Sequence, residues 1–184
     1  MRHVGNAGVA TIWDKSLSSA VTPLPDGSDR VVAVHINALP EQVIIINTYL
    51  PTQGTHADVA YADILDEVLE IIDKFSPNNR IIWIGDMNAS LVRAKPNSND
   101  KQFISFCNAN KLKVLELPKD AITYKQRGGP GSSQIDYAVC MLDQPTTVTH
   151  TEVESKSPSA LNTSPHFAVL AHTRLTIVDT AVKP

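Results

Sequence analysis

Asp86 and Asn88 directly follow a short apolar run, Ile81 to Ile84, that is typical of a strand buried on both faces. They alternate with Met87, so in an extended chain both polar side chains project to the same side. A carboxylate and a carboxamide at the end of a buried strand can hold a metal ion, orient a water molecule or hold a phosphate oxygen. Glycine, aspartate and asparagine also form ordinary turns, so a turn without chemistry stays an alternative.

Four more polar residues stand near the ends of predicted strands. Asn47 and Tyr49 lie two residues apart on a β-branched strand and therefore share a face. Asp136 opens a later strand, and His166 opens the last one. An aspartate beside a histidine can orient the imidazole and raise its basicity, so that it holds a phosphate or moves a proton. Taken singly, each residue also has a structural explanation, as a packing residue, a turn residue or a satisfied histidine.

Length and composition bound the class of protein. The chain has 184 residues and 42% hydrophobic content, which predicts one globular domain, residues 1–184. No apolar run is long enough to span a bilayer, and the first residues lack the apolar core of a signal peptide. We therefore expect an intracellular protein with no membrane partner. Cys107 and Cys140 lie in apolar segments, which predicts reduced, buried thiols rather than a disulfide.

Charge is distributed unevenly along the chain. The net charge is -3, yet residues 93–127 hold eight basic and three acidic residues, a local balance of 8 - 3 = +5, which leaves -8 for the remainder. This segment follows the Asp86 turn, so its basic side chains could contact phosphates. The residues predicted to do so are Arg93, Lys95, Lys125 and Arg127. A dispersed set of lysines and arginines can equally form a solvated surface.

Hydrophobic patterning predicts alternating strands and helices. Leu65, Val68, Leu69 and Ile72 mark an amphipathic helix that lies between two buried strands, which indicates a crossover connection. A second helix is marked by Phe103, Phe106 and Cys107. Asp58 is the predicted N-cap of the first helix, and Asn99 or Asp100 that of the second. The predicted strands cover residues 9–13, 31–36, 43–50, 81–84, 113–115, 123–125, 135–140, 146–153 and 167–177.

The remaining segments are predicted to be turns and loops. Residues 5–8 form a turn, and residues 40–41 close a hairpin between two strands. The glycine-rich residues 127–133 do not lead into a helix as a phosphate-binding loop would, which favours a hairpin or surface loop. Residues 154–164, rich in serine, asparagine and proline, form the long loop before the last strand.

Five short motifs in this order resemble the endonuclease/exonuclease/phosphatase family, and in particular the apurinic/apyrimidinic endonuclease-like domains of non-LTR retrotransposons. The resemblance extends over nearly the entire chain. Gly-Asp-x-Asn and Ile-Asp-Tyr are its more specific elements. The motifs are Gly8-Val9-Ala10, Ile46-Asn47-Thr48-Tyr49-Leu50-Pro51, Ile84-Gly85-Asp86-Met87-Asn88, Ser133-Gln134-Ile135-Asp136-Tyr137 and Ser164-Pro165-His166-Phe167.

The resemblance implies an α/β (α+β) fold, a four-layer α/β sandwich of two mixed sheets flanked by helices, with a metal-dependent phosphodiesterase site at the strand ends. It implies that Asp86 and Asn88 position the attacking water and bind Mg²⁺ or Mn²⁺. Tyr49 would contact the scissile phosphate, and Asn47 and Asn88 would also bind substrate. His166 would stabilise the charge on a phosphate oxygen while Asp136 orients its ring. Positioning a nucleophile and compensating that charge are what phosphodiester cleavage requires.

This chain departs from the family in two places. Members of the family have a strand carrying an asparagine and a strand carrying a metal-ligating glutamate ahead of the segment that resembles Gly5 to Ala10, and both are missing here. The family's closing Ser-Asp-His is Ser-Pro-His at positions 164–166, and proline has no side-chain oxygen. Because Mg²⁺ prefers six oxygen ligands, we expect weak metal binding. The missing strands predict an uncovered sheet edge or face and hence self-association or a truncated reading frame.

Three functions fit these features. The first is a metal-dependent endonuclease of retrotransposon origin that nicks DNA. The second is a degenerate, non-catalytic copy that binds nucleic acid or a protein through the basic segment at residues 93–127. The third is a phosphatase that acts on a small phosphorylated molecule, since the fold alone does not choose a substrate.

Overall fold

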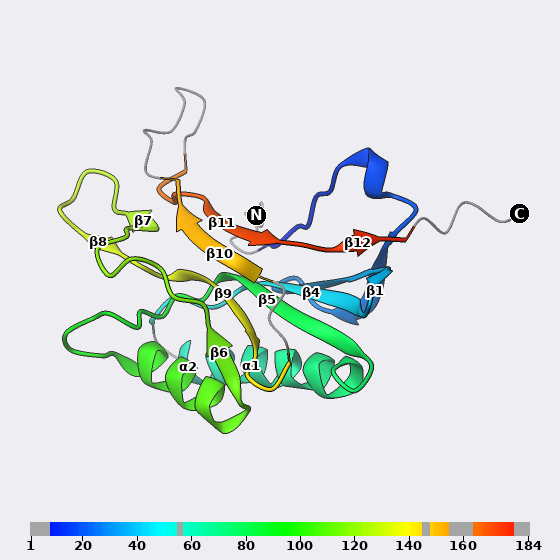
Figure 1. Cartoon of the computed structure of the whole chain (residues 1–184). Coiled ribbons are helices and arrows are strands. Elements are labelled where there is room, and N and C mark those ends of the chain that lie inside the picture. Colours follow the sequence, from blue (N-terminus) through cyan, green and yellow to red (C-terminus); the bar gives the residue numbers. More distant parts are fainter. Residues whose placement is uncertain (1–7, 55–56, 145–147, 155–163, 179–184) are drawn as a thin grey trace, which may run out of the picture.

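The computed structural model describes residues 8–54, 57–144, 148–154 and 164–178. Its largest element is a six-stranded mixed sheet with the strand order β1-β2-β4-β5-β9-β6 (Figure 1). Neighbouring strands are antiparallel except β4 and β5, which are parallel. The strands are β1 (Val21–Gly27), β2 (Val31–Ile36), β4 (Gln42–Tyr49), β5 (Asn79–Asp86), β9 (Asp136–Met141) and β6 (Leu112–Val114).

Two helices cover one face of this sheet (Figure 1). Helix α1 (Ala57–Phe75) connects the parallel strands β4 and β5, which confirms the predicted crossover. Helix α2 (Ser98–Ala109) follows β5. Apolar residues of the sheet, including Ile46, Trp83 and Val139, form one buried cluster with the inner faces of the helices. Burying these side chains fixes the strand register, because a shift of one residue would turn them to the other face.

The opposite face carries smaller strands. Val43, Ile82 and Ala138 form a second cluster there with Val148 at the start of β10. Strands β10 (Val148–Val153) and β11 (Val169–Thr173) pair with each other, and β12 (Thr176–Ile177) pairs with β3 (Ala38–Leu39). Figure 1 shows β10, β11 and β12 on the side away from the helices. The mixed α/β fold is confirmed, and within the described residues two two-stranded ladders stand where the second sheet was predicted.

Most predicted segments are confirmed with shifts of a few residues at their ends. Strands β2 and β4 form the predicted antiparallel pair, and the glycine-rich segment closes a hairpin between β7 (Tyr124–Lys125) and β8 (Ser132–Ser133). Cys107 and Cys140 are buried and not joined in a disulfide, as expected. Neither described helix is long and apolar enough to cross a membrane.

The strand predicted at residues 9–13 is wrong. These residues join no β-ladder among the described part of the chain, and a short 3-10 helix, Lys15–Leu17, follows them. Ile12 is 93% exposed, so the segment lacks the buried face that would hold a strand in place. Its contact with the sheet comes from Asn47, whose side-chain amide donates to the Ala10 carbonyl at 3.1 Å.

The prediction of a single last strand over residues 167–177 is also wrong. The chain forms β11 and β12, and these short strands pair with different partners, β10 and β3. Sequence patterning does not reveal this exchange of partners, because both halves have the composition of a strand.

Both predicted helix caps need correction. Asn97 caps α2, since its side chain accepts from the Asp100 amide at 2.9 Å while the Asp100 carboxylate accepts from the Asn97 amide at 2.8 Å. This reciprocal capping box makes Asp100 the third residue of the helix rather than its cap. Asp58 lies inside the first turn of α1. The turn predicted over residues 5–8 and most of the loop at 154–164 lie outside the described residues.

Candidate active site

Tyr49, Asp86 and Asp136 form a row across three neighbouring strands. Asp86, at the end of β5, lies opposite Tyr49 on the parallel strand β4 and opposite Asp136 on the antiparallel strand β9. Residues two apart on a strand share a face, so Asp86 continues the row of Ile82 and Ile84 on the side away from the helices. Sheet pairing thus joins residues that are 37 and 50 positions apart in the sequence.

His166 completes this row from a segment far away in the sequence. It pairs with Tyr124 through an isolated β-bridge, and the edge of one ring meets the face of the other with 5.0 Å between their centroids. Both Asp136 carboxylate oxygens lie 3.1 to 3.2 Å from His166 Nδ1. The opposite ring nitrogen, Nε2, lies 3.8 Å from Asp86 Oδ2. Asp136 therefore fixes the ring so that Nε2 faces the Asp86 carboxylate.

Asn88 is held against Asp86 by a tight turn. Its backbone has φ 45°, in the left-handed region, and its amide donates to Asp86 Oδ1 at 2.8 Å. Its side-chain amide donates to Asp86 Oδ2 at 3.2 Å and to the Leu50 carbonyl at 2.8 Å. With the NH₂ group bonded twice, the side-chain oxygen of Asn88 is the atom best suited to meet a ligand.

Buried contacts fix the strand ends beneath these groups. Tyr61 on α1 donates its hydroxyl to the Met87 carbonyl at 2.7 Å, and Trp83 donates its indole N–H to Thr48 Oγ1 at 2.8 Å. A Cβ atom on Gly85 would stand 2.0 Å from the Thr48 carbonyl oxygen, so only glycine allows β4 and β5 to approach this closely. The site therefore stands on rigid elements.

The pKa values of Asp86 and His166 are both shifted from their ordinary values. Burial, together with the negative charge of Asp136, raises the pKa of Asp86 to about 7. The hydrogen bonds from Asn88 and the nearby His166 oppose this rise. The hydrogen bond to Asp136 raises the pKa of His166, against the effect of burial. A carboxyl group whose pKa is raised to about 7, beside an imidazole whose pKa is also raised, is suited to proton transfer.

The same groups fit a divalent cation. Asp86, Asp136 and His166 can each offer one ligand atom, and these atoms all lie within 4.8 Å of one another. The sequence indicated Asp86 and Asn88 as ligands, and the structure adds Asp136 and His166 to the possible set. A cation would relieve the repulsion between the two carboxylates that raises the pKa of Asp86.

A cavity of about 480 Å³ opens above these groups. Arg93 is the only one of the four predicted basic residues in its lining, and Gln53 and Tyr124 extend the polar wall. Asn47 lies instead in a neighbouring cavity of about 380 Å³, which Asp86 and Asp136 also line. The full lining of the first cavity is Tyr49, Thr52, Gln53, Asp86, Asn88, Arg93, Asn97, Tyr124, Ser133, Ile135, Pro165 and His166.

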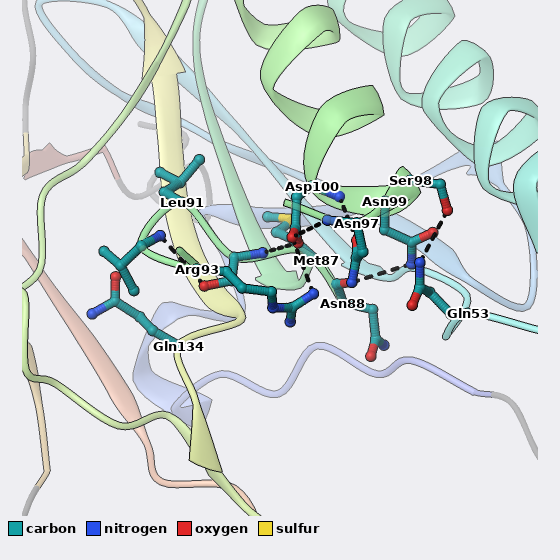
Figure 2. Close-up of polar contacts among 12 residues, drawn as sticks. Gln53, Met87, Asn88, Leu91, Arg93, Asn97, Ser98, Asn99, Asp100 and Gln134 are labelled. Carbon is teal, nitrogen blue, oxygen red and sulfur yellow. Dashed lines mark hydrogen bonds and ion pairs between the residues drawn. The ribbon is translucent and has the colours of Figure 1, made fainter. Parts of the chain in front are cut away.

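The other predicted basic residues do not reach this cavity. Lys95, Lys125 and Arg127 are exposed and are not part of its lining. Arg93 is tied down by an ion pair of 3.0 Å to the buried Asp100 (Figure 2). The structure therefore distinguishes Arg93, which lines the cavity and is held by Asp100, from three exposed basic residues that are outside the lining.

Sequence reasoning missed two contributions. Tyr124 packs against His166, and nothing in its local sequence distinguishes it from a packing residue. Asn99 and Asp100, the two predicted alternatives for the helix cap, are both fully buried. The Asn99 side chain bonds the segments that follow β4 and β5, and the Asp100 carboxylate bonds the segment that follows β5. Two adjacent polar residues ahead of Phe103 were the available signal, but only the structure shows which backbone groups they meet.

A family model described as endonuclease-reverse transcriptase matches residues 43–169, more than half of the chain. The chain belongs to this family. The match confirms the resemblance to endonuclease/exonuclease/phosphatase proteins, and it covers the segments that carry Tyr49, Asp86, Asp136 and His166.

The chain is also similar to craniofacial development protein 2 of Bos taurus, with 26% identity over 152 residues. The match spans 72% of this chain but only 25% of that protein.

Solved structures share the fold. The endonuclease domain of TRAS1, a telomere-specific non-LTR retrotransposon, has a TM-score of 0.68 at 19% identity, covering 84% of this chain and 67% of that one. The 3′ phosphatase NExo from Neisseria, bound to a product DNA hairpin, has a TM-score of 0.62 at 14% identity, covering 84% and 70%. An AP endonuclease from Archaeoglobus fulgidus has a TM-score of 0.61 at 13% identity, covering 83% and 71%. The family model thus shows the family, and the solved structures show that the chain shares their fold.

Proposed function

We propose that this chain is a divalent-metal-dependent phosphodiesterase of the endonuclease type that nicks DNA. One observation carries the proposal: Tyr49, Asp86 and Asp136 stand in register on three adjacent strands, and Asp136 holds His166 over that row. Acid, amide, phenol and imidazole groups thus converge on one cavity. These are the groups that position a nucleophile and compensate charge on a phosphate.

Each residue receives a role in this proposal. Asp86 and Asn88 orient the attacking water through the Asp86 carboxylate and the Asn88 side-chain oxygen. Tyr49 contacts the phosphate. His166 binds a non-bridging oxygen through Nε2, and Asp136 keeps the ring in that orientation. Protonated His166 would compensate the negative charge that develops there.

The Asp86 and Asp136 carboxylates would hold the cation, with the Asn88 side-chain oxygen as a further possible ligand, while His166 keeps its role at the phosphate. When bound, Mg²⁺ or Mn²⁺ supplies Lewis-acid stabilisation of the phosphate. Among the basic residues, Arg93 would contact the substrate at the cavity, and Lys95, Lys125 and Arg127 would contact the DNA backbone farther out. Asn47 would contact substrate from the neighbouring cavity.

Nicking of supercoiled plasmid tests this function. The purified protein is assayed with Mg²⁺ or Mn²⁺, beside Asp86→Ala and His166→Ala variants. Exposed residues of the same types, Asp63 and His172, supply matched alanine controls. We expect metal-dependent nicking that falls by roughly 100-fold or more in the two site variants and stays unchanged in the controls. No metal-dependent nicking, or equal nicking by all five proteins, would contradict the proposal.

A specific feature favours a second candidate, a non-catalytic domain that binds nucleic acid or a protein. Pro165 lines the cavity beside His166, where the resembling family has an aspartate, and it contributes no side-chain oxygen. Lys95, Lys125 and Arg127 would then form the binding surface. In this case DNA binding would weaken in the triple alanine variant and with rising salt, while no protein in the series would nick plasmid. A phosphatase would instead release phosphate from 3′-phosphorylated oligonucleotides without nicking.

We also propose retrotransposon origin, self-association and an intracellular location. A reverse-transcriptase coding sequence next to this gene would support the origin. Sedimentation as a dimer in analytical ultracentrifugation would support self-association, and a compact monomer would contradict it. The location can be checked with a fluorescently tagged chain.

A further inference from the structure

Asn99 joins the two strand ends that carry the site. It is the second residue of α2, it is fully buried, and its side-chain amide donates to two main-chain carbonyls. One is that of Pro51 at 3.0 Å, after β4. The other is that of Asn88 at 3.1 Å, after β5, and Figure 2 shows this contact. One side chain therefore sets the spacing between the segments that follow Tyr49 and Asp86.

Asn88 needs such support. Its backbone lies in the left-handed region, which asparagine adopts more readily than most residues other than glycine, so the contacts around it decide how firmly the turn is fixed. Its own side chain bonds the Leu50 carbonyl, and Asn99 bonds the next carbonyl, that of Pro51. Two carboxamides thus lie between the same pair of loops. Loss of the Asn99 bonds would free the Asn88 carbonyl and release Asn88 from this conformation.

The neighbouring Asp100 bonds the residues that follow Asn88, and it accepts hydrogen bonds where Asn99 donates them. Its carboxylate accepts from the Ser90 amide at 2.7 Å and from Arg93 at 3.0 Å. Carbonyl groups require a donor and amide groups an acceptor, so asparagine and aspartate at positions 99 and 100 match their partners. Figure 2 shows both side chains reaching from α2 toward the loop of Asn88.

A purely structural role explains Asn99 poorly. Its side-chain oxygen is buried without a hydrogen-bond partner among the described residues. A half-satisfied buried carboxamide costs stability relative to an apolar residue of similar size. Asn99 is also not needed to cap α2, because Asn97 and Asp100 complete the capping box. What Asn99 uniquely provides is two donors aimed at the loops of the site.

We propose that Asn99 is a positioning residue that fixes Asn88 against Asp86 for phosphodiester cleavage. The proposal deepens the proposed function and depends on it for its catalytic part. It assigns Asn99 no contact with the substrate, because Asn99 is absent from the lining of the cavity. Its effect on the reaction passes through the Asn88 side chain.

The test compares Asn99→Ala with Cys107→Ala, a control on the buried face of the same helix. Kinetics on a DNA oligonucleotide separate kcat from KM, and amide hydrogen exchange reports on the Asn88 N–H, which is bonded to Asp86 Oδ1. We expect kcat to fall roughly 10- to 100-fold in Asn99→Ala with KM changed by less than about 3-fold. Exchange at Asn88 should accelerate while the amides of β5 keep their protection. Cys107→Ala should lose stability but keep kcat and the exchange at Asn88.

Asn99→Ser keeps one donor and provides a second variant if Asn99→Ala does not fold. It should restore part of kcat and part of the protection at Asn88. Equal kcat in Asn99→Ala and Cys107→Ala, or unchanged exchange at Asn88, would overturn the proposal. If the wild-type protein does not cleave DNA, the proposed function fails, and the exchange comparison alone decides whether Asn99 fixes Asn88.

Discussion

At the scale of single residues, the site depends on two carboxylates, Asp86 and Asp136, that face each other across neighbouring strands. In the metal-free protein the pKa of Asp86 rises from 3.8 to about 7 on folding. Between these values the folded chain keeps a proton that the unfolded chain has lost. The stability that depends on Asp86 is therefore present below about pH 4 and is lost as pH rises toward 7.

This linkage predicts that Asp86→Asn removes a destabilising charge at neutral pH. We expect the variant to be more stable than wild type at pH 8 by about 1 to 3 kcal/mol, with the difference shrinking toward pH 4. Urea unfolding in EDTA across that pH range measures it. A difference that does not depend on pH, or a variant that is less stable at pH 8, would contradict the raised pKa of Asp86.

The pairing of Asp136 with His166 gives a second prediction. The hydrogen bond to Asp136 raises the pKa of His166 above its usual 6.5, while burial lowers it. In Asp136→Asn the effect of burial is larger than the remaining effect of the Asp86 charge, so the pKa of His166 should fall. NMR titration of the imidazole protons measures this change. An unchanged pKa of His166 in Asp136→Asn would show that the hydrogen bond to Asp136 does not raise it.

At the scale of secondary-structure elements, the parallel contact between β4 and β5 decides where the site residues meet. Gly85 has φ 139°, and a Cβ there would stand 2.0 Å from the Thr48 carbonyl oxygen. Gly85→Ala should therefore cost more than about 2 kcal/mol through backbone strain and a clash with β4. Gly54→Ala, where nothing lies within 4 Å of the added carbon, is the control and should be nearly neutral. Equal denaturation midpoints for the two variants would refute this account.

The sequence predicted the long secondary-structure elements but not all of the short ones. Periodicity correctly predicted α1, β2, β4 and β5, because long apolar faces leave regular patterns. It failed at residues 9–13 and at the division between β11 and β12, where the outcome depends on which strand edge is available for pairing. Short strands with exposed faces have too little buried surface to leave such a pattern.

At the scale of the whole molecule, the convergence of distant residues required more than local patterning. The family resemblance brought together Tyr49, Asp86, Asp136 and His166, and sheet register and an isolated bridge do place them side by side. The resemblance did not reveal Tyr124 or Asn99, since their contacts arise from the packing of β7 and α2 against the strand ends. Nor did charge patterning distinguish Arg93, which lines the cavity, from Lys95, Lys125 and Arg127, which do not.

Metal binding should act on the whole fold, because the two carboxylates that would hold the cation, Asp86 and Asp136, come from β5 and β9. A cation that binds only the folded chain stabilises it by mass action, by about 2.7 kcal/mol at 100 times Kd. For a domain of this size such a gain raises Tm by roughly 5 to 10 °C.

Metal binding requires ionised Asp86, so the increase in Tm on adding Mn²⁺ should be larger at pH 8 than at pH 6. Calorimetry of wild type and Asp86→Asn, each with Mn²⁺ or EDTA, measures it. An equal increase in both proteins would place the cation elsewhere and leave the Asp86, Asp136 and His166 cluster without a role in binding metal.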